Sequence, residues 1–333
     1  MSFTFRPAVR ENINLLLGLA APSGAGKTLS AMKIAKGICG DKPFAMIDTE
    51  ARRGLHYADM FRFDHAEIKS PFRPDAYTEA IAAAEAAGYG AIITDSMSHE
   101  HEGEGGVLDW QEEELSELVK RAKERGDSRK EWELIEAYKR SAWIKPKAAH
   151  KRMVQKLLQC RSHLIVCLRA EDKIDFVKDE KTKKTKVVPM ETLSGFKGWI
   201  PICDKRFLFE LTASFILLPD RPGVPQPIKL QEQHKAFFPL DRPLDEECGR
   251  KIAEWAKGGS AAATSQPHQP QSQPSADAHA LKKQLQEATT VAELDRIAKL
   301  AKSLPDAEKA ELREQYIDRK TELLDAQRQK ESA

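Results

Sequence analysis

The sequence is poor in cysteine and shows no pairing pattern for the few cysteines that it contains. There are five, at Cys39, Cys160, Cys167, Cys203 and Cys248, and no two form a C-x-x-C pair. The sequence also lacks a signal-peptide pattern and any apolar run that approaches the roughly 20 residues of a membrane-spanning helix. These absences exclude a disulfide-stabilised secreted domain and a membrane protein, and they predict reduced thiols in a cytoplasmic protein.

An excess of charge of one sign is absent as well. The 53 Lys and Arg residues and the 51 Asp and Glu residues leave a formal net charge of +2. Any surface for nucleic acid must therefore be local and not global. A hydrophobic content of 41% is sufficient for a sizeable buried core, and 333 residues allow one large domain with appended segments.

The most informative stretch runs from Ile13 to Ile38 and predicts a short apolar strand, a glycine-containing turn and a helix. The turn, A-P-S-G-A-G-K-T at residues 21–28, fits the P-loop pattern at every defined position except the first, where Ala21 replaces Gly. Gly24 and Gly26 allow the backbone to curl so that successive N–H groups face one concavity, where phosphate oxygens bind. The positive end of the following helix adds to this attraction.

This turn predicts a site for a nucleoside triphosphate. Lys27 would reach the β- and γ-phosphates, and the hydroxyl of Thr28 would occupy a Mg²⁺ position. An ordinary glycine-containing turn is the alternative, but the match over the whole turn, in its strand–turn–helix context, argues against it. We therefore expect ATP and Mg²⁺ to bind here, through Pro22, Ser23, Gly24, Ala25, Gly26, Lys27, Thr28 and Leu29.

Acidic residues follow two other predicted strands. Phe44–Ile47 predicts a buried strand that ends at Asp48-Thr49-Glu50, and Tyr89–Thr94 predicts another that ends at Asp95 and Ser96. Four apolar residues closing on an Asp are the Walker B arrangement, in which the carboxylate holds Mg²⁺ through water. Strands often end in Asp, but after a P-loop the pattern favours Asp95 as a Mg²⁺ residue.

The segment H-E-H-E-G-E-G-G at residues 99–106 contains two histidines flanked by glutamates, a composition that can chelate a metal ion. Its spacing does not fit a helical zinc motif, and its glycines favour a loop beside the phosphates. From Val107 to Gln159 the sequence is highly charged and predicts helices with a break near Gly126-Asp127. Most of these charges are typical of a solvated surface.

A further buried strand, His163–Leu168, ends at Arg169. An arginine at this strand end can contact the γ-phosphate of a bound nucleotide, which would give Arg169 a catalytic role. An ordinary surface arginine is an equally good interpretation. Ile174–Val177 and Lys184–Val188 then alternate in the manner of a β-hairpin.

The tip of this predicted hairpin is rich in lysine, with only Asp179 and Glu180 against it. Lysines on a flexible tip suit contacts with phosphates, which give affinity without reading sequence. The tip has no aromatic residue, so stacking on bases would require Phe176, Phe196 or Trp199 nearby. An ordinary solvated hairpin is the alternative. The residues that we expect to contact nucleic acid are Lys181, Lys183, Lys184 and Lys186.

The rest of the predicted core consists of strands at Lys205–Leu218 and Pro227–Leu230 and a helix that ends near Lys257. Residues 258–280 are dominated by Gly, Ser, Ala, Gln and Pro and predict a flexible linker. Residues 281–333 predict a small helical module, which is too small to be stable without internal packing or a partner.

Three motifs carry a resemblance to a known family: the P-loop, I-D-T-E at residues 47–50, and I-T-D-S at residues 93–96. With them, residues 10–250 resemble the RecA/RadA/KaiC group of P-loop ATPases. More narrowly, the sequence looks like the RecA-like "AAA family ATPase" proteins of bacteriophages, some of which act in single-strand annealing or recombination. The resemblance implies that Glu50 activates the attacking water. Where RecA has a Gln that couples ATP to DNA, this chain has Arg169.

The resemblance also implies a homo-oligomer with the nucleotide at a subunit border. Lys205 or Arg206 of a neighbouring subunit would then complete the site, although a surface strand end is the alternative. For a bacteriophage protein, the compartment would be the host cytoplasm.

We expect a three-layer, RecA-like α/β core with a mainly parallel sheet over residues 1–257 and the nucleotide at the carboxyl ends of its strands. The favoured function is an ATPase that acts on nucleic acid, with single-stranded DNA as the partner. One alternative is a nucleotide-dependent scaffold that recruits a protein partner through residues 281–333. Another is a P-loop kinase for a small molecule, against which Glu50 beside the γ-phosphate favours water as the nucleophile.

Overall fold

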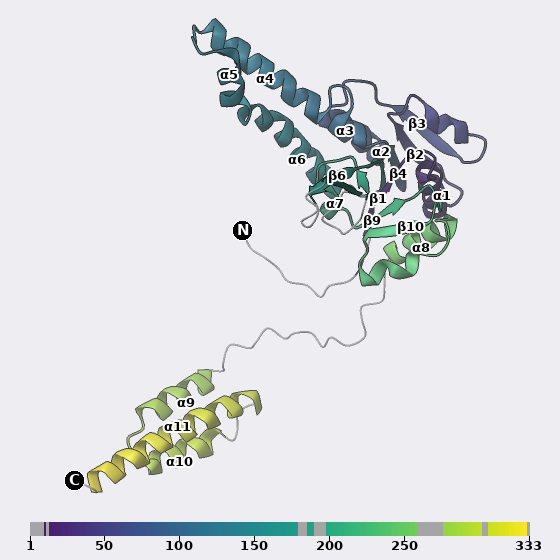
Figure 1. The fold of residues 1–333 in the computed structure, drawn as a ribbon. Coiled ribbons are helices and arrows are strands. Elements are labelled where there is room, and N and C mark those ends of the chain that lie inside the picture. The colour runs from purple at the N-terminus through teal and green to yellow at the C-terminus, as the bar shows by residue number, and fades with distance from the viewer. Residues whose placement is uncertain are drawn as a thin grey trace. The chain divides into compact units, whose positions relative to one another are not determined.

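The computed structural model describes residues 10, 13–178, 185–189, 198–258, 276–301 and 306–331. The described residues form two compact units, one within residues 8–261 and the other within residues 262–333. Figure 1 shows both units as ribbons.

The first unit is built on an eight-stranded sheet in the order β10-β9-β1-β5-β4-β2-β3, with β8 paired to β5 outside this path. Neighbouring strands from β9 to β3 are parallel, whereas β10 and β8 are antiparallel to their partners. A mixed α/β fold with a mainly parallel sheet is therefore confirmed. The strands of this sheet are β1 Leu16–Ala21, β2 Phe44–Asp48, β3 Phe63–Glu67, β4 Ala91–Asp95, β5 His163–Asp172, β8 Trp199–Pro201, β9 Ala213–Leu217 and β10 Pro225–Lys229.

Helices connect the strands. The α-helices of this unit are α1 Lys27–Cys39, α2 Pro74–Ala86, α3 Ser98–Glu102, α4 Val107–Glu124, α5 Glu131–Tyr138, α6 Ile144–Leu158, α7 Phe207–Glu210 and α8 Glu246–Ala256. Short 3-10 helices are η1 Arg53–Tyr57, η2 Ser141–Trp143 and η3 Glu232–Phe237.

The central strands are buried on both faces, which explains their continuous apolar sequences. In β1, Leu17 and Leu19 face a cluster that includes residues of α1 and α8. Leu16 and Ala20 face the opposite cluster, which includes residues of α2 and α6. Because successive side chains of a strand point to opposite faces, the sheet is a middle layer between two layers of helices (Figure 1).

Helices α1 and α8 approach closely at two glycines. A Cβ on Gly37 would lie 1.9 Å from the backbone oxygen of Glu246, and a Cβ on Gly249 would lie 2.1 Å from that of Ile34. Any larger side chain would force the helices apart. The contact fixes α1, and therefore the turn that precedes it, against the sheet.

A helical arm of α4, α5, η2 and α6 stands between β4 and β5 in the chain and projects from the sheet (Figure 1). It confirms the predicted helices with a break near residue 126, where Gly126 has a positive φ of 83°. Val119, Ala122 and Leu134 form a small buried cluster where α4 and α5 pack together.

Two predictions of secondary structure are wrong, and one strand was missed. Lys205–Leu218 is not one strand: a turn at residues 205–206 leads into α7, and the strand β9 begins only at Ala213. The continuous apolar run conceals this change because periodicity cannot separate a short buried helix from a strand. Residues 99–106 were expected to be a loop, but Ser98–Glu102 is helical, and the strand Phe63–Glu67 was not predicted.

The predicted hairpin is confirmed as the antiparallel pair β6 Ile174–Lys178 and β7 Thr185–Pro189. This pair forms a separate two-stranded sheet. Its expected DNA-contacting residues Lys181, Lys183 and Lys184 lie outside the described residues, as does Phe196. Lys186 belongs to β7.

The second unit consists of α9 Ala276–Glu287, α10 Val291–Leu300 and α11 Asp306–Glu331. Thr290 and Glu293 form a capping box at the start of α10. Helix α9 begins before the expected start of the module at residue 281, and residues 259–275 of the expected linker lie outside the described residues. The buried cluster of this unit consists of Leu285, Ala288, Leu294, Ile297 and Leu312.

In the described part of the chain, none of the helices combines the length and the apolar character that crossing a membrane requires.

Candidate nucleotide site

A cavity of about 860 Å³ opens at the carboxyl ends of the parallel strands β1, β2, β4 and β5. This is the edge at which parallel α/β sheets bind ligands, and the volume is in the range of ligand pockets. Lys27, Thr28, Glu50, Asp95 and Arg169 all line it. Residues from four separate parts of the sequence therefore meet at one place.

The predicted phosphate-binding turn forms one wall of this cavity. Gly24 and Gly26 have φ angles of 82° and 87°, which non-glycine residues rarely adopt. Gly26 precedes α1, whose first turn has neither a capping side chain nor an acidic residue. The N–H groups of the first turn of α1 have no acceptors within the helix and can bind an anion.

One predicted contact differs from the others. All the other residues expected to bind the nucleotide line the cavity, but Ala25 does not, and its side chain is buried in the core. The backbone oxygen of Ala25 accepts a hydrogen bond of 3.0 Å from the N–H of Gly223. Pro222, in the same segment between β9 and β10, lines the cavity. Sequence patterns give no sign that this distant segment supports the P-loop.

The two residues predicted to hold Mg²⁺ are in contact. The hydroxyl of Thr28 donates a hydrogen bond to Oδ2 of Asp95 at 2.5 Å, and Nζ of Lys27 lies 3.1 Å from Oδ1 of the same carboxylate. Although Oδ1 is paired with this charge, it accepts no hydrogen bond of good geometry. One hydroxyl and one carboxylate beside a phosphate site are a donor set that suits Mg²⁺, which keeps several waters and takes phosphate oxygens as further ligands.

Glu50 lies between three positive side chains. Its carboxylate is 3.8 Å from Nζ of Lys27, accepts a hydrogen bond of 3.0 Å from Nε of Arg169, and accepts one of 3.3 Å from Arg53. Burial alone would raise the pKa of Glu50, but the charges of Lys27 and Arg169 and the hydrogen bond from Arg169 outweigh it and lower this pKa. The carboxylate is therefore ionised at neutral pH.

Burial also acts against the charge of Lys27. The carboxylates of Asp95 and Glu50 outweigh this effect, so the pKa of Lys27 is raised. The ammonium group is thus held at the mouth of the P-loop by two carboxylates, with only 11% of its side chain exposed.

Asp48, which the sequence did not single out, holds the loop that carries Glu50. Its buried carboxylate accepts hydrogen bonds from the N–H groups of Glu50 at 2.6 Å and Gly54 at 2.9 Å. Nε2 of His65 on β3 lies 3.2 Å from the same group. The position of Asp48 in I-D-T-E was the available signal, but only the strand order brings His65 beside it.

A second set of contacts ties the end of β2 to that of β4. The N–H of Thr49 donates to the backbone oxygen of Asp95 at 2.8 Å, and the hydroxyl of Thr49 accepts a hydrogen bond of 2.8 Å from the N–H of Ser96. The same hydroxyl lies 2.7 Å from Nδ1 of His99, whose ring stacks on Phe72 at 4.9 Å. These bonds fix Asp95 relative to the loop of Glu50.

The histidines and glutamates of residues 99–102 do not converge on one position where they could bind a metal ion together. His99 contacts Thr49, whereas Oε1 of the buried Glu100 lies 2.9 Å from Nδ1 of His150 on α6. Glu102 lines the cavity, and burial and the nearby Glu171 raise its pKa. Among the residues that the structure describes, no group of three or more His, Cys, Asp or Glu side chains could hold a metal by itself.

Arg169 also lines the cavity, and its side chain is 44% exposed, more than those of Lys27, Glu50 and Asp95. In the register of the sheet it lies opposite Ala21, the first residue of the P-loop. The N–H of Arg169 donates to the hydroxyl of Ser98 at 2.8 Å, which in turn donates to the backbone oxygen of Ile202 at 2.7 Å.

The remaining predicted residues are not brought to this cavity. Lys205 and Arg206 are exposed in the turn before α7. Trp199 is half-buried in β8. None of them lines the cavity as the structure describes it.

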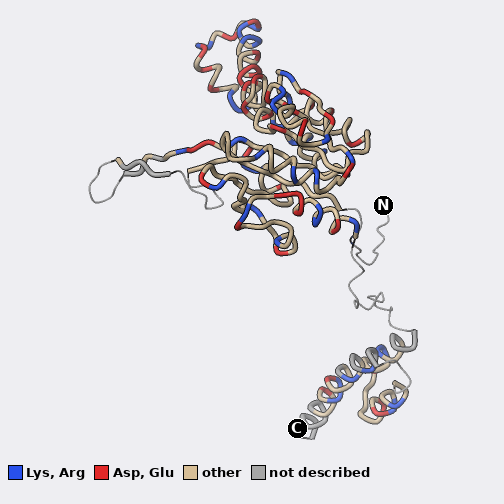
Figure 2. Tube along the Cα trace, turned by 90° about the vertical axis from the view of Figure 1, so that its right-hand side faces the viewer, with Lys and Arg blue, Asp and Glu red and all other residues tan. Residues whose placement is uncertain are grey.

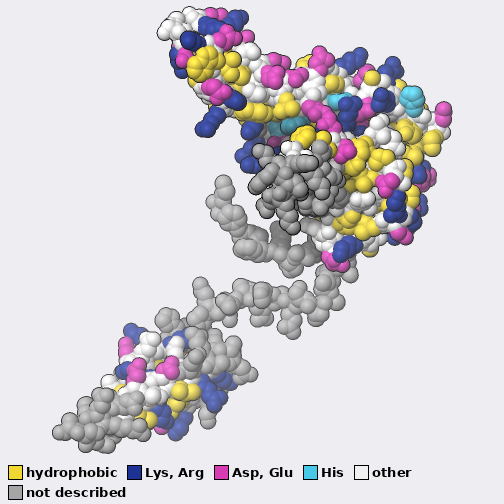
Figure 3. All heavy atoms as spheres, viewed as in Figure 1, with side chains coloured by type: hydrophobic (Ala, Val, Ile, Leu, Met, Phe, Trp, Pro, Cys, Tyr) yellow, Lys and Arg dark blue, Asp and Glu magenta, His cyan; other side chains and the backbone are white. Residues whose placement is uncertain are grey.

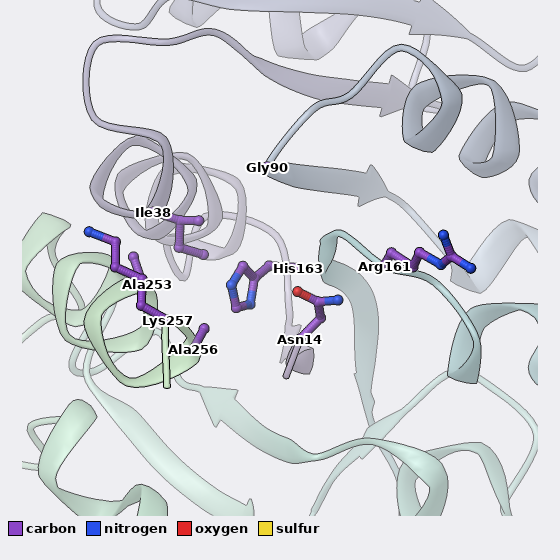
Figure 4. Close-up of a pocket in the computed structure, with 8 residues that line it drawn as sticks. All are labelled: Asn14, Ile38, Gly90, Arg161, His163, Ala253, Ala256 and Lys257. Carbon is purple, nitrogen blue, oxygen red and sulfur yellow. The ribbon is translucent and has the colours of Figure 1, made fainter. Parts of the chain in front are cut away.

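A second cavity, of about 710 Å³, lies at the opposite edge of the sheet (Figure 4). Nδ1 of His163 accepts a hydrogen bond of 3.1 Å from the N–H of Leu15, and burial lowers the pKa of His163 to about 4. The imidazole is therefore neutral. The guanidinium of Arg161 extends away from His163 in this view, so the charged groups do not converge on one ligand.

No protein-family model matches the sequence, and no curated protein matches it either. The site is therefore interpreted from its own residues.

Proposed function

We propose that the chain binds ATP with Mg²⁺ at the P-loop, hydrolyses it, and couples hydrolysis to the binding of single-stranded DNA. The observation that carries the ATPase part is the convergence of Lys27, Thr28, Glu50 and Asp95 on one cavity, from the ends of three strands. Each side chain is within 4 Å of another member of this group.

The residues divide the chemistry among them. Lys27 and the N–H groups of the first turn of α1 bind the β- and γ-phosphates and offset their charge. Thr28 and Asp95 would hold Mg²⁺, which neutralises charge that develops on the phosphate oxygens. Glu50 is the nearest carboxylate to Lys27 after Asp95, and it orients a water molecule and accepts its proton.

Arg169 serves as a positioning residue in this proposal. It donates to Oε1 of Glu50 and leaves Oε2 of the same carboxylate to Arg53. Since Arg169 is the more exposed partner, a γ-phosphate can compete with Glu50 for its guanidinium. The nucleotide and the base would thereby share one arginine.

Two observations support hydrolysis over the alternatives. The pKa of Glu50 is lowered, so its carboxylate is ionised, and it lies beside Lys27, where it can accept a hydrogen bond from an attacking water. A pure scaffold would not require this carboxylate beside Lys27. The second observation is the negative charge that Glu102, Glu171 and Glu50 present in the cavity. It argues against a small-molecule kinase, which would have to bind its second substrate there.

The choice of single-stranded DNA is supported by the RecA-like motifs and by the lysine-rich sequence between β6 and β7. The hairpin strands leave the sheet directly after β5, the strand that carries Arg169. In this proposal Lys181, Lys183, Lys184 and Lys186 contact phosphates, and DNA bound there reaches the nucleotide through Arg169. A homo-oligomer, and a protein partner for residues 281–333, belong to the same proposal.

The test is the ATPase rate of the full chain with no polynucleotide, single-stranded DNA, duplex DNA and RNA. We expect basal hydrolysis and stimulation by single-stranded DNA. ATP binding without turnover in any arm would favour the scaffold. Phosphate transfer to a small molecule, with water excluded, would favour the kinase.

Assembly is tested separately by sedimentation at micromolar concentration with and without a non-hydrolysable ATP analogue. We expect association in the presence of the analogue. A strict monomer in both conditions would overturn the subunit-border part of the proposal and leave the ATPase part standing.

A further inference from the structure

The charges of the helical arm are separated by sign, although the whole chain is nearly neutral. Residues 96–119 contain eight Asp and Glu residues and no Lys or Arg. Residues 137–170 contain nine Lys and Arg residues and no Asp or Glu. Over the rest of the trace that is drawn in colour, Lys and Arg positions and Asp and Glu positions are mixed (Figure 2). A segment of this length with nine charges of one sign creates a local field that the net charge of +2 conceals.

The structure separates these charges in space. The acidic segment ends in α4 and the basic segment includes α6, which packs beside α4 in the arm. In the view of Figure 3, Asp and Glu side chains gather along the edge of the arm that α4 forms, and Lys and Arg side chains gather along the edge of α6.

Pairing with acidic neighbours accounts for only part of the basic segment. Lys145 lies 2.8 Å from Glu114 on α4, and Arg152 lies 3.9 Å from Asp75 on α2. These two ion pairs have a structural use, because they fasten α6 to the helices against which it packs.

Three other lysines of α6 form no ion pair that fastens the helix to its neighbours in the described part of the chain. Nζ of Lys147 lies 4.8 Å from the centre of the Trp143 ring and has no acidic partner among the described residues. Lys151 and Lys156 are exposed and likewise have no ion pair in the described part of the chain. Lys147 and Lys151 are about one turn apart and share a face, whereas Lys156, nine residues from Lys147, lies on the opposite side of the helix.

The same surface carries apolar side chains that face solvent. Ile144 is 68% exposed and precedes Lys147 and Lys151 by three and seven positions, so these residues share one face of α6. Trp143 lies beside them under the ammonium of Lys147. Lysines interleaved with exposed apolar and aromatic groups suit a single strand, whose phosphates and unstacked bases are both accessible.

We propose that the face of α6 that carries Ile144, Lys147 and Lys151 is a binding surface for single-stranded DNA. It is a different part of the sequence from the lysine-rich segment between β6 and β7. The inference rests on the proposed action of the protein on DNA and adds a second surface to it. A strand bound to α6 would lie on an arm fixed to the site, since Glu100, four residues beyond Ser96, contacts His150 of the same helix.

The test is a double substitution, Lys147→Gln and Lys151→Gln, in the full chain. Gln has nearly the helix propensity of Lys, so α6 is retained. The matched control removes the same charge from the acidic helix by Lys120→Gln and Lys123→Gln. Binding of labelled oligothymidylate, duplex DNA and poly-L-glutamate is measured from 50 to 200 mM salt, with melting temperature as the check on folding.

We expect the α6 variant to bind oligothymidylate about tenfold or more weakly than the wild type. We also expect the slope of log K against log salt to become shallower by about 1.4, at roughly 0.7 per lost phosphate contact with a single strand. The control variant should keep most of the affinity, and basal ATPase should be unchanged in both variants.

The possible failures are distinguishable. If the wild type binds oligothymidylate and the α6 variant matches it in affinity and slope, the α6 surface is wrong while the proposed function stands. Equal losses in the α6 and control variants would show a net-charge effect and overturn the inference. Tighter binding of poly-L-glutamate, lost in the α6 variant, would identify an acidic protein partner instead. A wild type that binds no DNA would overturn both proposals.

Discussion

Nε of Arg169 donates a hydrogen bond of 3.0 Å to Oε1 of Glu50, although their strands β5 and β2 are separated in the sheet by β4. The bond spans the end of β4, where Asp95 lies. Glu50 is 13% exposed and Arg169 is 44% exposed, so the arginine is the partner that solvent or a ligand reaches first. The proposed base is thus linked to a side chain that a nucleotide can engage.

Replacing Arg169 by Gln should raise the pKa of Glu50. Burial raises this pKa and is opposed by the charges of Lys27 and Arg169 and by the hydrogen bond from Arg169. Wild-type kcat should fall on the acid side only below the ordinary Glu pKa of about 4.3, whereas the kcat of the variant should fall at higher pH. Coincident acid limbs of the two pH–rate profiles would contradict the assignment of Arg169 as the residue that tunes Glu50.

Lys27→Ala and Glu50→Gln should separate binding from turnover. Lys27→Ala removes the charge nearest the β- and γ-phosphates and should abolish ATP binding. Glu50→Gln should leave ATP binding intact and lower kcat by about a hundredfold or more, in line with the loss of a general base. Equilibrium binding of a fluorescent ATP analogue and steady-state hydrolysis measure the two effects.

If Glu50→Gln hydrolyses ATP at the wild-type rate, the general base must be another carboxylate. Sequence alone leaves Glu100 and Glu102 as candidates, but the structure narrows the choice. Glu100 is 2% exposed and engaged with His150, so it cannot reach a water in the cavity. Glu102 lines the cavity and would be the next residue to test.

The sequence predicts those parts of the site that local chemistry determines. The glycines and Lys27 of the P-loop, and the Asp at the end of β4, are recognisable because each requires only its own strand and turn. The contact of Glu50 with Arg169 is different, since it depends on which strands are neighbours. Pro222 and Gly223 belong to the same class, because they reach the P-loop from a connection about 200 residues away in sequence.

The secondary structure likewise has parts that depend on nearby residues and parts that depend on distant ones. The continuous apolar run of β1 and the capping box at Thr290 and Glu293 can be recognised from nearby residues alone. The apolar run Lys205–Leu218 could not be divided in advance, because both Phe207 of α7 and Phe215 of β9 are fully buried. This burial depends on which other helices and strands pack against the segment, and the hydrophobic periodicity of the segment does not reveal it.

Removing residues 259–333 should leave the first unit folded and its basal ATPase unchanged. Each unit has its own buried cluster, and that of the second is centred on Leu285, Leu294 and Leu312. Thermal unfolding of the truncated and full chains, followed at the same protein concentration, measures the effect. A lower melting temperature of the remaining unit would show that the helical module stabilises it.

Asp48→Asn should reduce turnover more than ATP binding. The carboxylate accepts N–H bonds from Glu50 and Gly54, one on each oxygen. An amide has a single acceptor oxygen, so one of the two N–H groups loses its partner at a cost of about 1–3 kcal/mol. The loop that carries Glu50 should loosen, lowering kcat while the dissociation constant for ATP stays near the wild-type value. Equal losses in both would show that Asp48 shapes the phosphate site itself.

The pair of His150 and Glu100 should make stability depend on pH. Burial lowers the pKa of His150, but the hydrogen bond and charge of Glu100, together with Asp204, outweigh it and raise this pKa. The charged pair therefore stabilises the fold fully below the unfolded His pKa of about 6.5, and this stability is lost as the pH rises through the higher folded value.

His150→Gln should accordingly cost about 1.5–3 kcal/mol at pH 6, the range for a hydrogen bond to a charged group, and less at pH 9. Denaturant unfolding of the wild type and the variant at both pH values measures the difference, and His56→Gln, which removes an exposed imidazole, is the control. A cost that is the same at pH 6 and pH 9 would mean that His150 is neutral throughout and only donates a hydrogen bond to Glu100.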